Sequence, residues 1–226
     1  QTDVRRTTAL IEHPEATIEL ALDLGHIQAK QHRLSINELE FELVKGEMAA
    51  VFSTALQWQQ QYELIMELRS KAERGDALYE GTLSHSDFSH IDEGTNGALQ
   101  QIIRYAAFVI NVDANPHSSQ KQAQYLLGLR VAMRRLRSYQ QLFAPWLSRK
   151  ERQLAKELRH YYRAFGLWRD QQMLTHELQP KLQQAGLPLP PTAAPQFAHP
   201  ADIAASLGFQ RLLLQLLALQ LEQGAT

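Results

Sequence analysis

The densest group of residues suited to bind an anion lies in residues 126–143, LLGLRVAMRRLRSYQQLF. Arg130, Arg134 and Arg137 have the spacing that places side chains on one face of a helix. An adjacent apolar face is marked by Leu129, Met133, Leu136 and Phe143. Planar guanidinium groups suit phosphate oxygens, so such a row with few acidic partners is typical of a polyanion site or of a solvated helix face.

A second group consists of carboxylates on two segments that alternate with period two. In residues 17–25 the alternation places Glu19 and Asp23 opposite Ile18, Leu20, Leu22 and Leu24, which indicates a half-buried strand. In residues 36–44 it places Glu38, Glu40 and Glu42 together. The carboxylate face is either the solvated exterior of a sheet or an acidic lining for Mg²⁺ or Mn²⁺, which prefer oxygen ligands. Basic residues that could complement such a lining occur at Arg6 and in residues 69–75.

The chain of 226 residues, with 44% hydrophobic and 21% charged residues, is long enough for one or two domains with a buried core. Its formal net charge of −1 conceals two halves of opposite sign. Residues 1–80 hold 8 Lys/Arg and 14 Asp/Glu, whereas residues 120–170 hold 12 and 3. An acidic, strand-rich segment followed by a basic, helical one predicts two domains with different ligands.

Other compositional features concern the compartment. The absence of cysteine excludes disulfides and thiolate metal sites, and it fits a reducing cytoplasm. No apolar run approaches the roughly 18 residues of a membrane span, and the N-terminus does not resemble a signal peptide. We therefore expect a cytoplasmic protein without a membrane partner.

The elements that must position these residues follow from periodicity and from start and stop signals. Besides the two strands, which are separated by a polar bend at residues 28–35 and the second of which ends at a Lys45-Gly46 turn, we expect a helix over residues 48–66. This helix leads into a short strand around residues 64–68. Residues 79–100 read as a linker, and a helix from about Thr95 to residue 115 follows. Beyond the arginine-rich helix, a capping box of Ser148 and Glu151 starts a helix that ends near a turn at residues 166–170.

That helix carries a second basic stripe, so the two basic helices are expected to pair as a hairpin with a basic groove. The stripe consists of Arg152, Lys156, Arg159 or His160, and Arg163. A short helix over residues 173–182 and a proline-rich loop over residues 183–200 are expected next. The last helix, residues 203–222, is apolar nearly all round and must be covered.

Three separated motifs in residues 1–81, EATIELALDLGHIQA, NELEFELVKGE and LRSKAERGDALYEG, resemble the second half of a CYTH domain, the triphosphate tunnel fold. The resemblance implies an antiparallel barrel in which carboxylates hold a divalent metal and basic residues grip triphosphate. It assigns Asp23, Glu38, Glu40 and Glu19 to the metal, Arg6, Lys71 and Arg74 to the substrate, and Lys71, Glu38 and Glu40 to catalysis. The family's Glu-x-Glu-x-Lys strand does not occur in this sequence, so we expect a partial barrel.

Two further motifs, LRVAMRRLRSYQQLF and YRAFGLWRDQQML, resemble the CHAD domain over about residues 95–222. This resemblance implies a helical module that binds polyphosphate through a basic face. The residues it assigns to that face are Arg130, Arg134, Arg135, Arg137, Lys156, His160 and Arg163. Leu127 stands where the family usually has a histidine, so we expect binding by charge and no proton transfer.

Both resemblances imply linear polyphosphates as ligands. We expect an α+β protein with a partial CYTH barrel in residues 1–81, a linker in residues 82–94 and a CHAD half in residues 95–226. The expected function is hydrolysis of inorganic triphosphate or polyphosphate with Mg²⁺ or Mn²⁺, the helices binding polyphosphate. The alternative is a polyphosphate-binding module without enzymatic activity. Nucleic-acid binding is less favoured, because the sequence lacks an exposed aromatic platform for bases.

Overall fold

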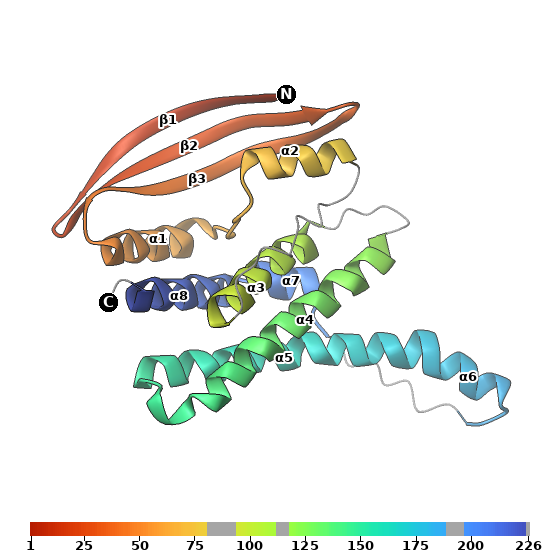
Figure 1. Cartoon of the computed structure of the whole chain (residues 1–226). Coiled ribbons are helices and arrows are strands. Elements are labelled where there is room, and N and C mark those ends of the chain that lie inside the picture. The colour runs from red at the N-terminus through yellow and green to blue at the C-terminus, as the bar shows by residue number, and fades with distance from the viewer. Residues whose placement is uncertain (81–93, 112–117, 189–196, 225–226) are drawn as a thin grey trace. The chain divides into compact units, whose positions relative to one another are not determined.

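The structure is a computed structural model of the chain, and it describes residues 1–80, 94–111, 118–188 and 197–224 (Figure 1). The chain divides into two compact units. The first unit contains residues 1–92 and 213–226, and the second contains residues 93–212. Most of the expected linker, residues 82–94, lies outside the described residues.

The first unit is built on three antiparallel strands in the order β1-β2-β3. The strands are β1 (Thr2–His13), β2 (Ala16–Ala29) and β3 (His32–Gly46). The bend expected at residues 28–35 is confined to Lys30 and Gln31, where Lys30 adopts a positive φ of 54°. The α+β class and the antiparallel pairing are confirmed, but the sheet is open and the described residues contain no closed barrel.

Both faces of β2 are covered by helices, and this differs from the expected half-buried strand. On one face Ile18 packs with Ala50 and Val51 of α1 (Met48–Tyr62). On the other face α2 (Lys71–Glu80) lies close enough that a Cβ on Gly75 would be 3.4 Å from the Ile27 side chain. Asp23, on the α2 side, is therefore only 1% exposed.

The segment between these two helices is where the sequence prediction was wrong. α1 ends at Tyr62 with Glu63 in the left-handed region, and residues 64–68 form no strand. A helix, α2, follows instead, and its first turn has reciprocal capping bonds. The Ser70 hydroxyl accepts from the Glu73 N–H at 3.1 Å, and the Glu73 carboxylate accepts from the Ser70 N–H at 2.7 Å.

The second unit is helical. Its longer helices are α3 (Thr95–Ile110), α4 (Ser118–Leu142) and α5 (Arg149–Met173), and α7 (Pro200–Ala205) contacts α3 and α5. The apolar face predicted for α4 is confirmed at Leu129, Met133 and Leu136, which are buried. Phe143 was assigned to that face but is 48% exposed, because α4 ends before it and the chain turns into a 3₁₀ segment, Ala144–Trp146.

The capping box that starts α5 is confirmed, with Ser148 accepting from the Glu151 N–H and Glu151 accepting from the Ser148 N–H. The turn expected at residues 166–170 is wrong, since α5 continues to Met173. A π-helical turn, Leu174–Leu178, and α6 (Gln179–Gln184) then extend it. Gly166 lies inside this helix against α4, and a Cβ built on it would be 3.4 Å from Nη2 of Arg130.

The expected final helix is divided at Ser206 into α7 and α8 (Leu207–Gly224). The Ser206 hydroxyl accepts from the Phe209 N–H at 3.3 Å and so caps the second helix. Burial of this apolar segment is confirmed, for Phe209, Leu212, Leu213 and Leu216 are all buried.

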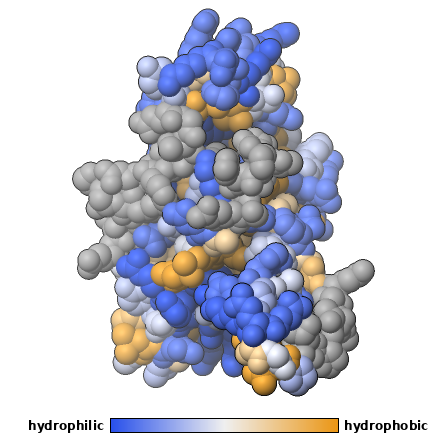
Figure 2. Space-filling model, turned by 90° about the vertical axis from the view of Figure 1, so that its right-hand side faces the viewer, coloured by the Kyte–Doolittle hydropathy of each residue, from blue (hydrophilic) through white to orange (hydrophobic). Residues whose placement is uncertain are grey.

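The described helices include none with the length and apolar character that crossing a bilayer requires. On the face shown in Figure 2, hydrophobic surface occurs as separate areas within a mostly hydrophilic surface. Scattered exposed apolar side chains of this kind are normal for a folded protein in water and do not by themselves mark a binding site.

Candidate functional site

Three carboxylates of the first unit meet on the sheet face that α2 covers. Asp23 of β2 lies directly opposite Glu38 of β3, and Glu40 lies two residues further along the same face of β3. One carboxylate oxygen from each of the three residues lies within 4.8 Å of the other two. The strand register thus brings together three of the four residues assigned to a metal. Glu19, the fourth, lies opposite Glu42 and is not part of this acidic cluster.

Three cations enclose the acidic cluster. Lys71, the first residue of α2, places its Nζ 2.7 Å from both Asp23 and Glu40 and in contact with Glu38. Arg6 of β1 donates to both Asp23 oxygens, at 2.8 and 2.6 Å, and to Glu40 at 2.5 Å. Arg74 donates to Glu38 at 2.6 Å. The substrate-binding residues expected from the sequence therefore neutralise the carboxylates.

Hydrogen bonds within the network favour the charged forms of Asp23, Glu40 and Lys71. The hydrogen bond from Arg6 holds the pKa of Asp23 far below its usual range, although burial acts in the opposite direction. Hydrogen bonding from Lys71 likewise lowers the pKa of Glu40. Burial alone would lower the pKa of Lys71, but hydrogen bonds to Asp23, Glu38 and Glu40 raise it above its usual range. At neutral pH the Lys71 ammonium group therefore acts as a counter-ion among carboxylates.

The acidic cluster fits a hard divalent cation in its donor set. All three donors are carboxylate oxygens, and their separation allows them to share one ion. The same three carboxylates contact Lys71, so a bound cation must replace at least part of these interactions. Once released from the carboxylates, Lys71, Arg6 and Arg74 could donate to phosphate oxygens.

The second unit has cations without such partners. Arg130, Arg134 and Arg137 of α4 form no ion pair with any carboxylate in the described part of the chain. Arg134 is exposed, while Arg130 and Arg137 are partly buried. Arg135 is also exposed and has no ion-pair partner among the described residues, and it donates to the amide oxygen of Gln101 at 3.2 Å. The basic face predicted for α4 therefore carries positive charge that no described acidic residue offsets.

Tyr162 of α5 contacts this face, which the sequence interpretation did not foresee. Its ring centroid lies 5.2 Å from the guanidinium carbon of Arg130 and 4.6 Å from that of Arg137. The spacing of Tyr162 from Leu158 and Gly166, four residues on either side, was the available signal for a residue facing α4.

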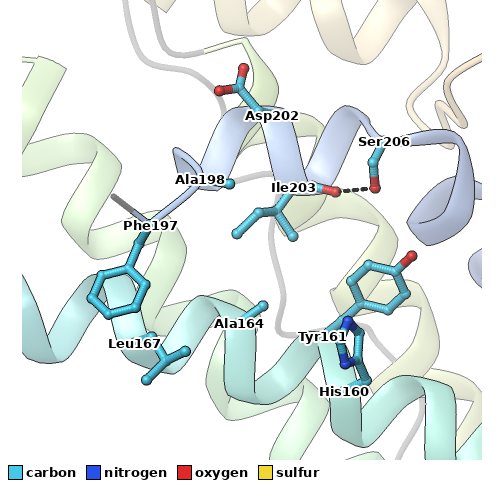
Figure 3. Close-up of a pocket in the computed structure, with 9 residues that line it drawn as sticks. All are labelled: His160, Tyr161, Ala164, Leu167, Phe197, Ala198, Asp202, Ile203 and Ser206. Carbon is cyan, nitrogen blue, oxygen red and sulfur yellow. Dashed lines mark hydrogen bonds between the residues drawn. The ribbon is translucent and has the colours of Figure 1, made fainter. Parts of the chain in front are cut away.

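Three residues of α5 were predicted to join the basic face that binds polyphosphate, but one of them lines a separate pocket. Lys156, His160 and Arg163 are exposed. His160, however, lines a pocket of about 300 Å³ with residues of α7 and of the segment before it (Figure 3). Leu167, Phe197 and Ile203 make its wall largely apolar, and the nearby Asp202 points away from them. This pocket lacks the cations that a phosphate group requires, so it is not the predicted anion site.

Comparison with known proteins places the helical region in a family. The CHAD domain family matches residues 103–223, more than half of the chain, and the chain belongs to this family. The resemblance noted in the arginine-rich motifs is thereby confirmed. A relative of the chain is the inorganic triphosphatase of Haemophilus influenzae, 35% identical over 77 residues. The match covers 34% of this chain and 22% of that protein, so the chain spans only about a fifth of its relative's length.

Proposed function

We propose that the second unit binds linear inorganic polyphosphate or triphosphate through the basic face of α4 and α5. The observation that carries this proposal is the set of arginines on α4 without carboxylate partners among the described residues. Neighbouring guanidinium groups repel one another, and a polyanion that lies along them relieves this repulsion while accepting several charge-assisted hydrogen bonds. Membership in the CHAD family supports the same ligand class.

The geometry favours polyphosphate over single-stranded nucleic acid. Binding of unpaired bases depends on aromatic rings whose faces are free for stacking. On this basic face the ring of Tyr162 already contacts Arg130 and Arg137. The face therefore offers hydrogen-bond donors for phosphate oxygens, whereas its aromatic ring is engaged by arginines.

The binding proposal is tested by titrating the 226-residue chain with fluorescently labelled polyphosphate. Arg130→Gln, Arg134→Gln and Arg137→Gln together should weaken binding at least tenfold and reduce its dependence on salt. A matched control, Arg5→Gln with Arg33→Gln and Arg211→Gln, removes the same charge from other elements and should retain most of the affinity. Equal losses in both triple variants would show that only net charge matters and would reject the site. Single-stranded DNA at equal phosphate concentration should compete poorly.

We further propose that the first unit takes part in divalent-metal-dependent hydrolysis of triphosphate. The acidic cluster of Asp23, Glu38 and Glu40 would hold Mg²⁺ or Mn²⁺, and Lys71, Arg6 and Arg74 would hold the phosphate oxygens. The partial similarity to an inorganic triphosphatase supports this role, as does the triphosphate tunnel resemblance of residues 1–81. When bound, the metal would polarise a phosphoryl group and favour ionisation of water.

The side chains would orient the substrate before that chemistry. Lys71 is anchored at the first turn of α2, and Arg6 reaches the same carboxylates from β1. Cations approaching the phosphates from separate elements can fix the position of a flexible triphosphate and stabilise the charge that develops on its oxygens. Exposed carboxylates nearby, such as Glu42, have no such cation partners among the described residues.

Two measurements separate metal binding from activity. Calorimetric titration with Mn²⁺ should show a site that Glu38→Gln with Glu40→Gln abolishes, whereas Glu42→Gln with Glu47→Gln should leave it intact. Phosphate release from tripolyphosphate should require Mg²⁺ or Mn²⁺ and should be lost in the first double variant. If the unmodified chain binds polyphosphate but releases no phosphate, hydrolysis by this chain is rejected and the polyphosphate-binding module remains.

A further inference from the structure

We propose that Tyr162 of α5 is a positioning residue that holds Arg130 and Arg137 of α4 together as one clamp for a chain of phosphates. This inference rests on the proposed polyphosphate binding and identifies what orients two of the binding residues. Tyr162 itself would not contact the ligand. Its ring contacts both guanidinium groups. The two arginines held in this way bind a linear chain of several phosphates in preference to a single phosphate ion.

The first observation is that one ring serves two arginines. Arg130 and Arg137 are seven residues apart, so their backbones are separated by roughly 10 Å along the helix axis. Their guanidinium carbons lie 5.2 and 4.6 Å from the Tyr162 centroid and are therefore no more than about 10 Å from each other. Long, flexible side chains of like charge would otherwise diverge into solvent. The shared contact with an aromatic ring opposes that divergence.

The second observation is that no described polar partner fixes either guanidinium group. Nη1 of Arg130 is buried and has no hydrogen-bond partner in the described residues. Neither arginine forms an ion pair with a described carboxylate. Hydrogen bonds or carboxylates usually set the orientation of a partly buried arginine. Here the contacts with α5 take over that role, so the orientation depends on Tyr162.

The third observation is the fit of Arg130 against Gly166, one turn beyond Tyr162 on α5. A Cβ built on Gly166 would lie 3.4 Å from Nη2 and 3.6 Å from Cζ of Arg130. A methyl group at this position would just touch the guanidinium, and a longer side chain would occupy its place. Gly166 and the ring of Tyr162 thus together form the surface of α5 against which the Arg130 guanidinium group packs.

The clamp has a consequence for ligand choice. The two guanidinium groups contact the same ring and have no carboxylate partner among the described residues, so they repel each other in the free protein. A single phosphate engages one of them well, whereas a linear chain can reach both and removes the repulsion. Loss of the Tyr162 ring should therefore weaken polyphosphate binding more than binding of orthophosphate.

The test is a double-mutant cycle on the full chain, with labelled polyphosphate as the probe and orthophosphate as the competitor. Tyr162→Met should weaken polyphosphate binding about tenfold, the order expected for loss of two cation–π contacts. Tyr162→Phe keeps the ring and should bind within about twofold of the unmodified protein. In a chain that already carries Arg130→Gln and Arg137→Gln, Tyr162→Met should cause no further loss. Tyr162→Leu is a second aliphatic variant, and the helical circular dichroism of each variant is checked.

The outcomes separate the clamp from the binding proposal itself. Equal loss from Tyr162→Met in both backgrounds would show a general structural role and overturn the inference, as would no loss in either one. Weak binding by Tyr162→Phe would point to its hydroxyl group and also overturn it. If instead the Arg130→Gln, Arg137→Gln chain binds as tightly as the unmodified protein, the proposed binding face itself fails.

Discussion

Replacement of Asp23 by asparagine tests whether the ion-pair network stabilises the first unit. The change keeps the shape of the side chain but removes its charge and replaces one acceptor oxygen by an NH₂ donor. Asp23 is 1% exposed and accepts hydrogen bonds from both Arg6 and Lys71. The new donor would therefore face the donors of two cations. Breaking a buried ion pair from one side costs about 3–5 kcal/mol, and loss of a charge-assisted hydrogen bond about 1.5–3 kcal/mol.

The free-energy cost of Asp23→Asn should lie near the lower end of these ranges, because both cations keep other carboxylate partners. Arg6 is 45% exposed and keeps its contact with Glu40. Lys71 keeps its contacts with Glu38 and Glu40. We therefore expect Asp23→Asn to lower the free energy of unfolding of the first unit by about 2–3 kcal/mol. This corresponds to an increase of roughly 30- to 150-fold in the population of the opened state.

Hydrogen exchange of the β2 and β3 amides, followed by mass spectrometry, measures this change within the first unit. A local probe is needed because unfolding of a chain with two units need not follow one two-state transition. The control is Asp76→Asn, since Asp76 is exposed and has no ion-pair partner among the described residues. Equal exchange in Asp23→Asn and the control would refute the stabilising role of the network.

The pKa shift of Asp23 gives the same prediction a pH dependence. The pKa of Asp23 is lowered in the folded state, chiefly by the hydrogen bond from Arg6. The carboxylate therefore contributes its stabilisation above the unfolded pKa of about 3.9, and the contribution is lost as pH falls below that value. The difference in stability between the unmodified chain and Asp23→Asn should be constant near neutral pH and shrink below about pH 4. A difference that grows on acidification would contradict this assignment.

Three further changes test separate parts of the structure. Lys71→Met removes the ammonium group that competes with a divalent cation for the carboxylates, so calorimetry should show Mn²⁺ binding about tenfold more tightly. Weaker Mn²⁺ binding in this variant would show that Lys71 does not compete with the metal. Gly128→Ala places a Cβ 2.3 Å from the Tyr105 ring and should cost about 1–3 kcal/mol in thermal unfolding, less in a Tyr105→Leu background. Ser148→Ala should cost about 1 kcal/mol by removing the cap with Glu151, and Ser148→Asp should restore most of it.

The acidic cluster could be predicted because its chemistry follows from period two within single strands. Carboxylates at Glu38 and Glu40 share a face wherever the strand forms, and the pattern around Asp23 marks a second strand of the same kind. The alternating pattern did not predict that α2 covers this carboxylate face. The sequence Ser70-Lys71-Ala72-Glu73 already contains a capping box, which was the signal for this helix.

In the basic helices α4 and α5, the features set by neighbouring residues were predicted from the sequence, whereas the contacts between the two helices were not. The cap at Ser148 and the buried face of α4 depend on neighbours in the sequence, and both were predicted. The turn expected at Gly166 was wrong, because glycine lowers helix propensity by only about 1 kcal/mol and tertiary packing can offset that amount. Contact of Arg130 with Tyr162 depends on how α4 and α5 cross, which no local pattern encodes.

The two candidate sites differ in how their cations are balanced, and this difference bears on the order of binding under the proposed function. The arginines of α4 have no described carboxylate to leave, so a polyanion can bind them directly. In the first unit Lys71 and Arg6 must leave Asp23 and Glu40 before they can hold a phosphate. A divalent cation on the carboxylates would release them, and a triphosphate on the released cations would in turn expose the carboxylates. Because such coupling is reciprocal, metal and triphosphate should each strengthen binding of the other at this site, whereas polyphosphate binding to the helices needs no metal.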